Sequence, residues 1–292
     1  MRLPESTPAD VLLTEKAFLN RQELHNGTRL ACQVKVRDPL AVRIPQHLLS
    51  VKQYAATVVS VVELTHDIKE LRFQLTDPPT MDYSYGHYIQ VSIPDPDEGT
   101  ISRAYSISSP IDQKDVVELN VRLHPQRGTI PVGKGSTYLH NLKVGDEATL
   151  TGPYGEFELD TSPQTELICV GGGAVMAPMK NLILSILEHI PEKPVWLFFG
   201  CRTTDDVFYR EVFEELSKKH PHFKVIYALS ENADEQWDGE TGFIHLSVDQ
   251  YLPDDLHPHQ AFLCGPPPMI DAVTEVLLDK NMRPERIFYD KF

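Results

Sequence analysis

The sequence predicts an α/β plus β chain, in which an antiparallel β-barrel is followed by a doubly wound parallel β-sheet. Two patterns lead to this prediction. Residues 51–160 contain short β-rich stretches separated by Pro, Gly and Asp, whereas strand-like and helix-like stretches alternate from about residue 165 onward. The length of 292 residues is sufficient for two substantial cores. We therefore expect domains at residues 1–50, 51–160 and 161–292.

The first of these segments differs in character from the rest. Residues 11–24 are expected to form a helix, with Leu13, Phe18 and Leu24 as apolar positions among charged ones. Apolar residues then alternate over 34–44, which suggests strands that end at Pro45.

The barrel strands are expected where β-branched and aromatic residues are enriched. These stretches are residues 57–62, 70–75, 88–93, 103–107 and 116–122. In the last segment, strands are expected at 167–170, 195–200, 224–229 and 261–264, with helices at 179–189, 209–219 and 270–278. This alternation predicts a mostly parallel sheet with helices on both faces, which binds ligands at the carboxyl ends of its strands.

The composition excludes several classes of function. A formal net charge of −15 argues against a nucleic acid partner and against broad adsorption to an anionic membrane. The longest apolar run, residues 167–179, contains glycines and a proline and is too short to span a bilayer. The cysteines are far apart, so we expect free thiols, no metal site and a cytoplasmic location. They are Cys32, Cys169, Cys201 and Cys264.

The first candidate site lies in the expected strand at 103–107. Alternation along a strand puts Arg103 and Tyr105 on one face, with Ser106 next to them. A guanidinium can hold a phosphate through paired hydrogen bonds, and a tyrosine ring can lie flat against an aromatic cofactor. The alternative is an edge strand with a solvated arginine, and this segment alone does not decide between the two.

Two glycine-rich segments could bind phosphate. Glycines before Ser136 and Thr137 can start a short helix with free backbone N–H groups, although a simple turn and cap is the alternative. Residues 171–173 are all glycine and follow a strand, and Pro178 fits the first turn of the next helix. Such small residues let a dinucleotide approach the backbone, or they serve strand–helix packing alone.

The last two candidates are near the C-terminus. Cys264, Gly265 and Pro266 end a strand at the edge where such sheets bind ligands. The alternative for Cys264 is a small buried apolar residue. Phe292 ends an apolar pattern that favours docking of the tail, as opposed to a frayed terminus.

Taken in this order, the segments resemble the ferredoxin–NADP reductase superfamily over nearly all of residues 51–292. The resemblance implies an FAD-binding β-barrel and a nicotinamide-binding α/β domain. It implies that Arg103 meets the flavin pyrophosphate, that Tyr105 covers the isoalloxazine and that Ser106 lies near its N5. It also implies that Ser136, with Thr137, contacts the FAD phosphates.

The same resemblance assigns the nicotinamide side of the site. Gly171, Gly172, Gly173, Pro178 and Met179 would bind the second pyrophosphate. Cys264, Gly265 and Pro266 would lie beside the nicotinamide, and Phe292 would stack on the free flavin face. Ser106, Cys264 and Phe292 are therefore the positions expected at the reacting rings.

The implied function is an NADH dehydrogenase module that passes a hydride from NADH to FAD and then single electrons to an iron–sulfur or quinone-linked acceptor. Asp205 and Asp206 suit a free ribose hydroxyl and favour NADH, whereas Arg202 would suit NADPH. The alternatives are a free-standing ferredoxin, flavin or oxygenase-component reductase and a non-catalytic scaffold subunit.

A narrower resemblance concerns the partners. Residues 27–33 resemble the end of a plant-type [2Fe–2S] ferredoxin, and residues 237–245 and 289–292 are similar to the F subunits of the sodium-translocating NADH:quinone oxidoreductases. The resemblance implies a separate or upstream [2Fe–2S] ferredoxin domain as acceptor. It also implies subunits of a membrane redox complex, which would hold the chain on the cytoplasmic face of the inner membrane. Cys32 alone cannot supply the thiolate ligands of a cluster, so we expect a fragment or a degenerate ferredoxin remnant without iron.

Overall fold

A computed structural model of the chain describes residues 24, 26, 28–30, 50–126, 128, 131–155, 157–173, 176–231 and 236–291. The chain divides into two units, residues 1–45 and 46–292. In the first unit Leu24 is helical, and Arg29 Nη1 donates a hydrogen bond to its carbonyl oxygen at 3.0 Å. The expected ferredoxin remnant, with Cys32, otherwise lies outside the described residues.

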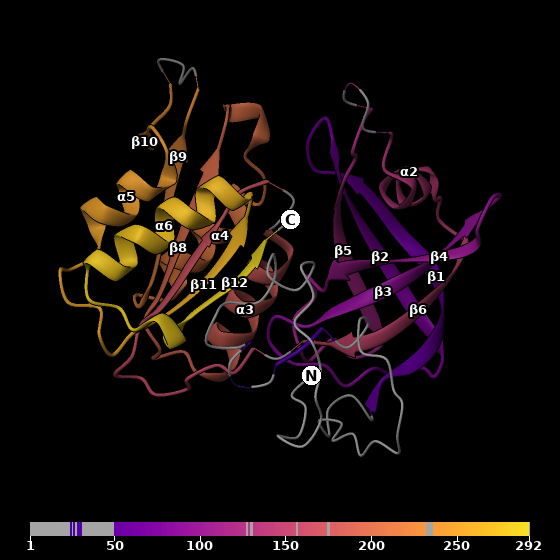
Figure 1. The fold of residues 1–292 in the computed structure, drawn as a ribbon, viewed down its shortest axis with the longest axis horizontal. Coiled ribbons are helices and arrows are strands. Elements are labelled where there is room, and N and C mark those ends of the chain that lie inside the picture. Colours follow the sequence, from indigo (N-terminus) through magenta and orange to yellow (C-terminus); the bar gives the residue numbers. More distant parts are fainter. Residues whose placement is uncertain are drawn as a thin grey trace. The chain divides into compact units, whose positions relative to one another are not determined.

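The second unit begins with a six-stranded antiparallel sheet in the order β4-β3-β6-β1-β2-β5 (Figure 1). Its strands are β1 (Lys52–Glu63), β2 (Ile68–Asp77), β3 (Tyr88–Asp95), β4 (Gly99–Ser106), β5 (Val116–Arg122) and β6 (Glu147–Tyr154). The predicted antiparallel strands are confirmed, and β6 is the strand of this sheet that the sequence did not predict. A bridge between Ile107 and Leu119 brings the end of β4 to β5, which lies at the other end of the strand order.

The inner face of this sheet follows the alternation of its strands. On β2, Leu71, Phe73 and Leu75 are buried, while the residues between them are less so. Helix α2 (Lys134–Asn141) adds Leu139, which is fully buried in the same core. Each large apolar side chain buried in this way contributes about 1.5–3 kcal/mol, so the alternation fixes which face of each strand points inward.

The second sheet has six strands in the order β10-β9-β8-β7-β11-β12, and every pair is parallel. Its strands are β7 (Leu167–Gly171), β8 (Val195–Cys201), β9 (Phe223–Leu229), β10 (Glu240–Thr241), β11 (Gln260–Gly265) and β12 (Ile287–Lys291). The predicted doubly wound sheet is confirmed. Strand β7 lies between β8 and β11, so the order reverses there, and ligands of such sheets bind beyond this switch point.

Helices cover both faces of this sheet (Figure 1). They are α3 (Met176–His189), α4 (Arg210–Lys219), α5 (Ile244–Tyr251) and α6 (Pro267–Asp279), with short 3₁₀ turns at Thr204–Asp206 and Pro284–Arg286. Leu182 and Phe213 place α3 and α4 in one core, while Val248 and Val273 place α5 and α6 in another. Helix α3 starts before the expected residue 179, so Pro178 lies within its first turn.

The barrel and the α/β domain of this unit are joined through α3. Asn181 Nδ2 donates to the Ser109 carbonyl at 2.5 Å, and the Gly86 N–H donates to Asn181 Oδ1 at 3.3 Å. The Ile111 N–H also donates to Ser185 Oγ at 3.0 Å. These bonds hold loops of the barrel against α3. In the part of the chain that the structure describes, no helix has the length and apolar character of a membrane span.

Candidate functional site

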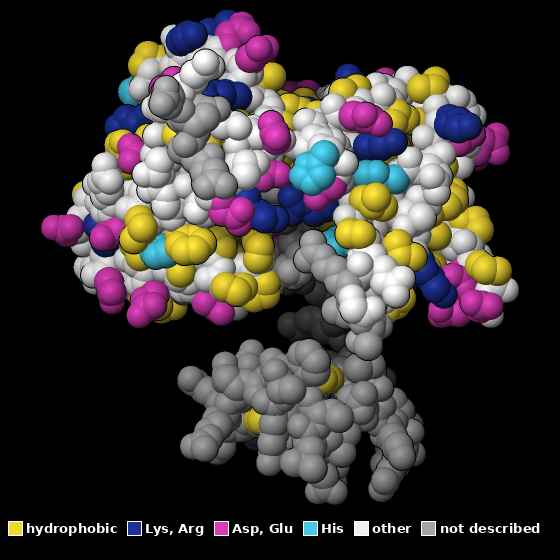
Figure 2. All heavy atoms as spheres, turned by 90° about the horizontal axis from the view of Figure 1, so that it is seen from above, with side chains coloured by type: hydrophobic (Ala, Val, Ile, Leu, Met, Phe, Trp, Pro, Cys, Tyr) yellow, Lys and Arg dark blue, Asp and Glu magenta, His cyan; other side chains and the backbone are white. Residues whose placement is uncertain are grey.

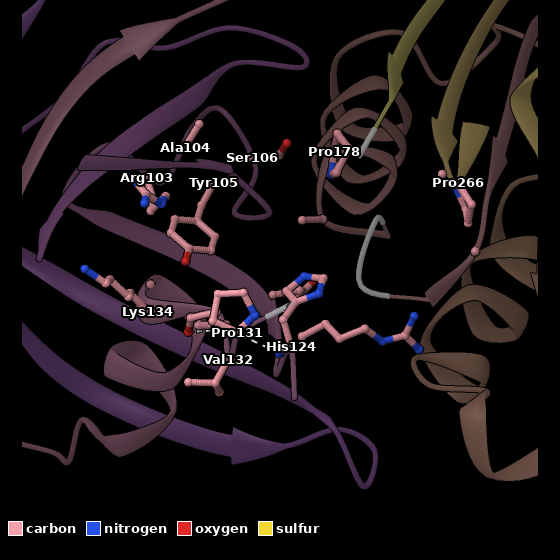
Figure 3. Close-up of a pocket in the computed structure, with 18 of the residues that line it drawn as sticks. Arg103, Ala104, Tyr105, Ser106, His124, Pro131, Val132, Lys134, Pro178 and Pro266 are labelled. Carbon is pink, nitrogen blue, oxygen red and sulfur yellow. Dashed lines mark hydrogen bonds between the residues drawn. The ribbon is translucent and has the colours of Figure 1, made fainter. Parts of the chain in front are cut away.

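A cavity of about 600 Å³ lies between the barrel and the α/β domain (Figure 3). Its volume is in the range of small-molecule and cofactor sites, which is roughly 300–1,000 Å³. The barrel contributes Arg103, Ala104, Tyr105, Ser106, Asn120, Arg122, His124, Gly133, Lys134, Gly135 and Ser136, and the α/β domain contributes Gly172, Ala177, Pro178, Gly265 and Pro266. The structure thus brings together, around one cavity, segments that the sequence predicted as separate candidate binding sites.

Arg103 and Tyr105 lie side by side on β4, as Figure 3 shows. Arg103 is exposed, and its Nη1 donates to the neighbouring Ser102 carbonyl at 2.8 Å. Burial raises the pKa of Tyr105 to about 12, so its hydroxyl stays protonated. A Cβ on Gly135 would lie 2.8 Å from both Arg103 Cγ and Tyr105 Oη, so this glycine lets α2 approach the pair closely.

Helix α2 begins at the cavity with Gly133 as its N-cap. Ser136 is buried, its Oγ donates to the Gly133 carbonyl at 3.1 Å and it accepts from the His124 N–H at 3.1 Å. The hydroxyl therefore fixes the loop before α2 and has little capacity left for a ligand. Thr137 was expected to contact a phosphate, but it lies on α2 away from the cavity wall.

Lys134 faces the same cavity but is already paired. Its Nζ lies 2.7 Å from Asp95 and 3.0 Å from Glu98, and these carboxylates raise the pKa of Lys134. Arg103, which forms no ion pair with a described residue, is therefore the stronger candidate for a phosphate. The acidic net charge leaves room for such local basic groups, and Figure 2 shows Lys and Arg side chains close together beside His and acidic ones.

The glycines after β7 have different surroundings. A Cβ on Gly172 would lie 2.6 Å from the Gly200 carbonyl oxygen, and Gly173 has a φ of +64°, so neither position tolerates a side chain easily. Gly172 lines the first cavity, and both glycines line a second cavity next to it. Gly171 and Met179 were predicted to bind the cofactor, but both are buried, and Gly171 packs against Met179 in the core.

The second cavity, of about 450 Å³, lies at the carboxyl ends of β7 and β8. Arg122, Gly172 and Pro266 line both cavities, so the two recesses adjoin. The remaining lining residues include Gly173, Gly200, Arg202, Asp206, Ser230, Phe243, His245 and Met269. This position corresponds to the ligand-binding edge of a doubly wound sheet.

Arg122 is a site residue that the sequence reading missed. It ends β5 of the barrel, and its Nε pairs with Asp67 Oδ2 at 2.9 Å without the alignment of a hydrogen bond. A Cβ on Gly173 would lie 2.9 Å from Arg122 Nη1, so the guanidinium reaches the glycine turn of the other domain. The available signal was a basic residue at the carboxyl end of a barrel strand, which is weak evidence without the fold.

Cys264 does not form part of either cavity wall. The side chain is fully buried at the end of β11, and burial, followed by the nearby Asp290 carboxylate, raises the pKa of this thiol well above its usual value. Its neighbours Gly265 and Pro266 supply the wall in its place. Asp290, in register with Cys264 on β12, lines neither cavity, and burial raises its pKa. Phe292 lies outside the described residues.

The two aspartates expected to select NADH differ in burial and in position relative to the second cavity. Asp206 is buried, and its Oδ2 accepts from the Thr203 N–H and Oγ1, each at 3.1 Å, so it caps a 3₁₀ turn. Asp205 is exposed and does not line the second cavity. Arg202 does line it, and pairs with Glu231 through bonds of 3.0 and 3.2 Å. The charge balance at this edge therefore depends on Glu231.

These residues fit two nucleotide cofactors in the adjoining cavities. The first cavity has a half-buried aromatic ring, an exposed guanidinium and a helix N-terminus approached through glycine, which suits a flavin nucleotide. The second has two glycines that leave the backbone open and a shared arginine, which suits a second pyrophosphate.

Comparisons with known proteins agree with this geometry. A family described as "Oxidoreductase FAD-binding domain" matches residues 55–159, and one described as "Oxidoreductase NAD-binding domain" matches residues 169–275. The chain is 33% identical to the F subunit of the Na(+)-translocating NADH-quinone reductase of Serratia proteamaculans, over 97% of this chain and 78% of that protein. The corresponding protein of Pseudomonas aeruginosa is 31% identical with the same coverage.

Two solved structures are similar along most of the chain. The cytochrome P450 reductase GcoB of Amycolatopsis has a TM-score of 0.74 at 27% identity, and the match covers 93% of this chain and 80% of that one. A ferredoxin reductase in carbazole 1,9a-dioxygenase has a TM-score of 0.70 at 29% identity, covering 83% and 70%. Both structural similarities therefore cover most of this chain.

Proposed function

Because this chain belongs to the ferredoxin reductase family of FAD- and NAD-binding oxidoreductases, which includes the F subunits of the Na(+)-translocating NADH-quinone reductases, we propose that it passes electrons from NADH through FAD to a one-electron acceptor. The observation that carries the proposal is the shared cavity, which has Arg103 and Tyr105 on one side and Pro178 and Pro266 on the other. We assign residues 51–160 to FAD binding and residues 161–292 to NAD binding.

Bound FAD supplies the redox chemistry, since it takes a hydride from NADH and gives electrons up singly. On the barrel side, Arg103 provides a permanent charge for the flavin pyrophosphate, and Tyr105 provides a half-buried ring on which the flavin can lie. Gly135 lets the N-terminus of α2 come close, so that backbone N–H groups face the phosphates. Ser106, at the end of β4, is the hydroxyl proposed next to the reacting edge of the ring.

On the α/β side, Gly172 and Gly173 leave the backbone open to the nicotinamide nucleotide, and Arg122 provides charge at the junction of the cavities. Cys264 stays a neutral thiol behind the cavity wall, so its proposed role is to support Gly265 and Pro266 beside the nicotinamide and not to act as a nucleophile. Pro178 and Pro266 bring apolar surface that excludes water from between the rings. Phe292 is proposed to cover the flavin until the nicotinamide enters.

The proposed nucleotide is NADH and not NADPH. Arg202, the cation of the second cavity that could meet a 2′-phosphate, is neutralised by Glu231. Asp206 adds a carboxylate to the same wall. Because Glu231 and Arg202 compensate each other, a 2′-phosphate would meet the Asp206 carboxylate and no free cation among the described residues of this edge, whereas a ribose hydroxyl would not be repelled.

The proposed acceptor is an iron–sulfur or quinone-linked centre on another domain or subunit. The similarity of this chain to an NADH-quinone reductase subunit, a cytochrome P450 reductase and a ferredoxin reductase supports this proposal. As part of a membrane redox complex, the chain would be held peripherally on the cytoplasmic face of the membrane. A free-standing reductase is the alternative, and reduction of an added ferredoxin in the absence of membranes would favour it.

The test is spectroscopic. The purified chain should bind FAD in a one-to-one complex with a flavin absorption band, and NADH should bleach this band under anaerobic conditions. Ferricyanide should restore it, because that route requires no further protein. A chain that binds neither FAD nor NAD⁺ would instead be a scaffold, and the proposed function would be wrong.

A further inference from the structure

The buried amide oxygen of a residue that lines the first cavity is left without a partner by the described residues. Asn120 lies on β5, is 6% exposed and lines this cavity. Its Oδ1 is buried and accepts no hydrogen bond. Because an unpaired buried acceptor is unfavourable, this oxygen indicates a donor that comes from a bound molecule.

The direction of the amide follows from the bond at its other end. Asn120 Nδ2 donates to Tyr209 Oη at 2.8 Å, and the Tyr209 hydroxyl donates to the Glu70 carboxylate. A carboxylate only accepts, so the single proton of the hydroxyl is directed to Glu70 and its lone pair faces Asn120. The amide must then present its NH₂ group to Tyr209, which leaves the buried Oδ1 as the amide atom available to a bound molecule.

A buried cation keeps Glu70 in the role of acceptor. Lys180 Nζ lies 3.1 Å from Glu70 and 2.6 Å from Glu118, and it lies 4.2 Å from the centre of the Tyr209 ring. Its side chain is 12% exposed, so solvent screens these contacts little. The chain of contacts therefore runs from Lys180 through Glu70 and Tyr209 to the cavity.

This chain of contacts crosses the domain boundary. Glu70 and Asn120 are on strands β2 and β5 of the barrel, whereas Tyr209 and Lys180 come from the α/β domain. Tyr209 precedes α4 with a φ of 58°, a left-handed conformation that is uncommon for a bulky residue. The direction of the Asn120 amide therefore depends on a residue that the other domain holds in an unusual conformation.

We propose that Asn120 orients a cofactor, in that its Oδ1 accepts a hydrogen bond from an amide N–H on a ring in the first cavity and Tyr209 sets its direction. The inference rests on the proposed function, because FAD and NADH supply such rings. The shared chemistry is a ring-borne amide donor, which is the imide N–H of a flavin or the carboxamide of a nicotinamide. Asn120 is a cofactor contact, and Tyr209 is a positioning residue.

The main test measures two dissociation constants separately. Asn120→Leu keeps the volume and removes the acceptor, so it should raise one dissociation constant about tenfold. A change for FAD, measured by titration of the FAD-free protein, identifies the flavin as donor. A change for NAD⁺, measured on the FAD-loaded protein from the flavin absorption band, identifies the nicotinamide.

Asn181→Leu is the matched control. Asn181 is also buried between the domains, but both ends of its amide bond to the protein, and it lines neither cavity. This variant should lower the melting temperature while leaving both dissociation constants unchanged. An equal rise in the same constant for both asparagine variants would attribute the effect to looser domain contact and would overturn the inference.

Tyr209→Phe tests the positioning role. Without the hydroxyl the amide is free to turn, so the same dissociation constant should rise by about threefold, less than with the acceptor removed. The double variant should bind no more weakly than Asn120→Leu alone, because the two residues act through one oxygen. A purely structural role would change the melting temperature in each variant and leave binding intact.

The outcomes separate this inference from the proposed function. If the unaltered chain binds no FAD, both are wrong. If it binds FAD and is reduced by NADH, but Asn120→Leu leaves both dissociation constants unchanged, only the role of Asn120 is wrong. Should Asn120→Leu fail to fold, unchanged binding in Tyr209→Phe overturns the inference in its place.

Discussion

The Lys180 ammonium lies 2.6 Å from a carboxylate oxygen of Glu118, and this buried contact joins α3 to β5 across the domain boundary. Ser108 Oγ donates to the same carboxylate oxygen at 2.6 Å, and Arg72 lies 3.8 Å from the other oxygen. A buried ion pair with these additional partners fixes how the two domains meet, since each charge depends on the others for compensation.

Removing the Lys180 charge should therefore be costly. Lys180→Met leaves Glu70 without its lysine and leaves Glu118 with only the more distant Arg72, and we expect a loss of about 3–5 kcal/mol in the free energy of unfolding. Urea denaturation would measure it. Lys219→Met is the control, because its pair with Glu215 is exposed and solvent screens it, so this change should barely affect stability. Equal stability of both variants would contradict a structural role for the buried pair.

Arg103→Ala should weaken FAD binding. The change removes a charge-assisted contact of about 1.5–3 kcal/mol, which corresponds to a dissociation constant raised by roughly ten- to a hundred-fold. Equilibrium titration of the FAD-free protein would measure it. Arg202→Ala, in the second cavity, should leave FAD binding unchanged. Undiminished FAD affinity after loss of Arg103 would remove this residue from the proposed site.

Local patterns in the sequence were sufficient for most of the fold. Alternation in 103–107 placed Arg103 and Tyr105 on one face, and the glycines after β7 marked the ligand edge of the sheet. Short elements such as β10 and β12 were missed because a few residues carry little periodicity.

The site was predictable only where the motif and the cavity wall coincide. Met179 and Cys264 follow the motif but point into the core, and a linear pattern does not reveal which side of a turn is buried. Arg122 and Asn120 were missed for the opposite reason. Their partners, Asp67 and Tyr209, are distant in sequence and become neighbours only when the chain folds and the domains dock.

Nucleotide preference should depend on Glu231. Wild-type protein should have a higher kcat/KM with NADH than with NADPH. Glu231→Gln releases Arg202 for a 2′-phosphate, so the ratio should shift toward NADPH by roughly tenfold. Asp238→Asn is the control, since it removes one of the two carboxylates paired with Arg210, which lies outside the second cavity. A wild-type preference for NADPH would contradict the assignment of Glu231.

The purified chain should contain no iron–sulfur cluster. Cys169, Cys201 and Cys264 lie buried in the parallel sheet, so they cannot join Cys32 as ligands while the sheet stays intact. No group of potential metal ligands occurs among the described residues. Iron and acid-labile sulfide analysis should give substoichiometric values. A stoichiometric content with an EPR signal after reduction would show that this prediction is wrong.

Asp290 should make the protein less stable as the pH rises. Burial raises the pKa of its carboxyl above the ordinary value of 3.8, so between these two values the folded state binds more protons than the unfolded state. The free energy of unfolding contributed by this group therefore falls as the pH increases through that window, and the loss is complete above the folded-state pKa. Asp290→Asn removes the titration, so its stability relative to wild type should rise between acidic and neutral pH.

Asp255→Asn is the control. Asp255 is an exposed carboxylate whose pKa is lowered by hydrogen bonds from the His257 N–H and Asn281, so its replacement should show the opposite trend. Urea denaturation of the three proteins across this pH range would measure both trends, and a flat difference for Asp290→Asn would exclude the raised pKa.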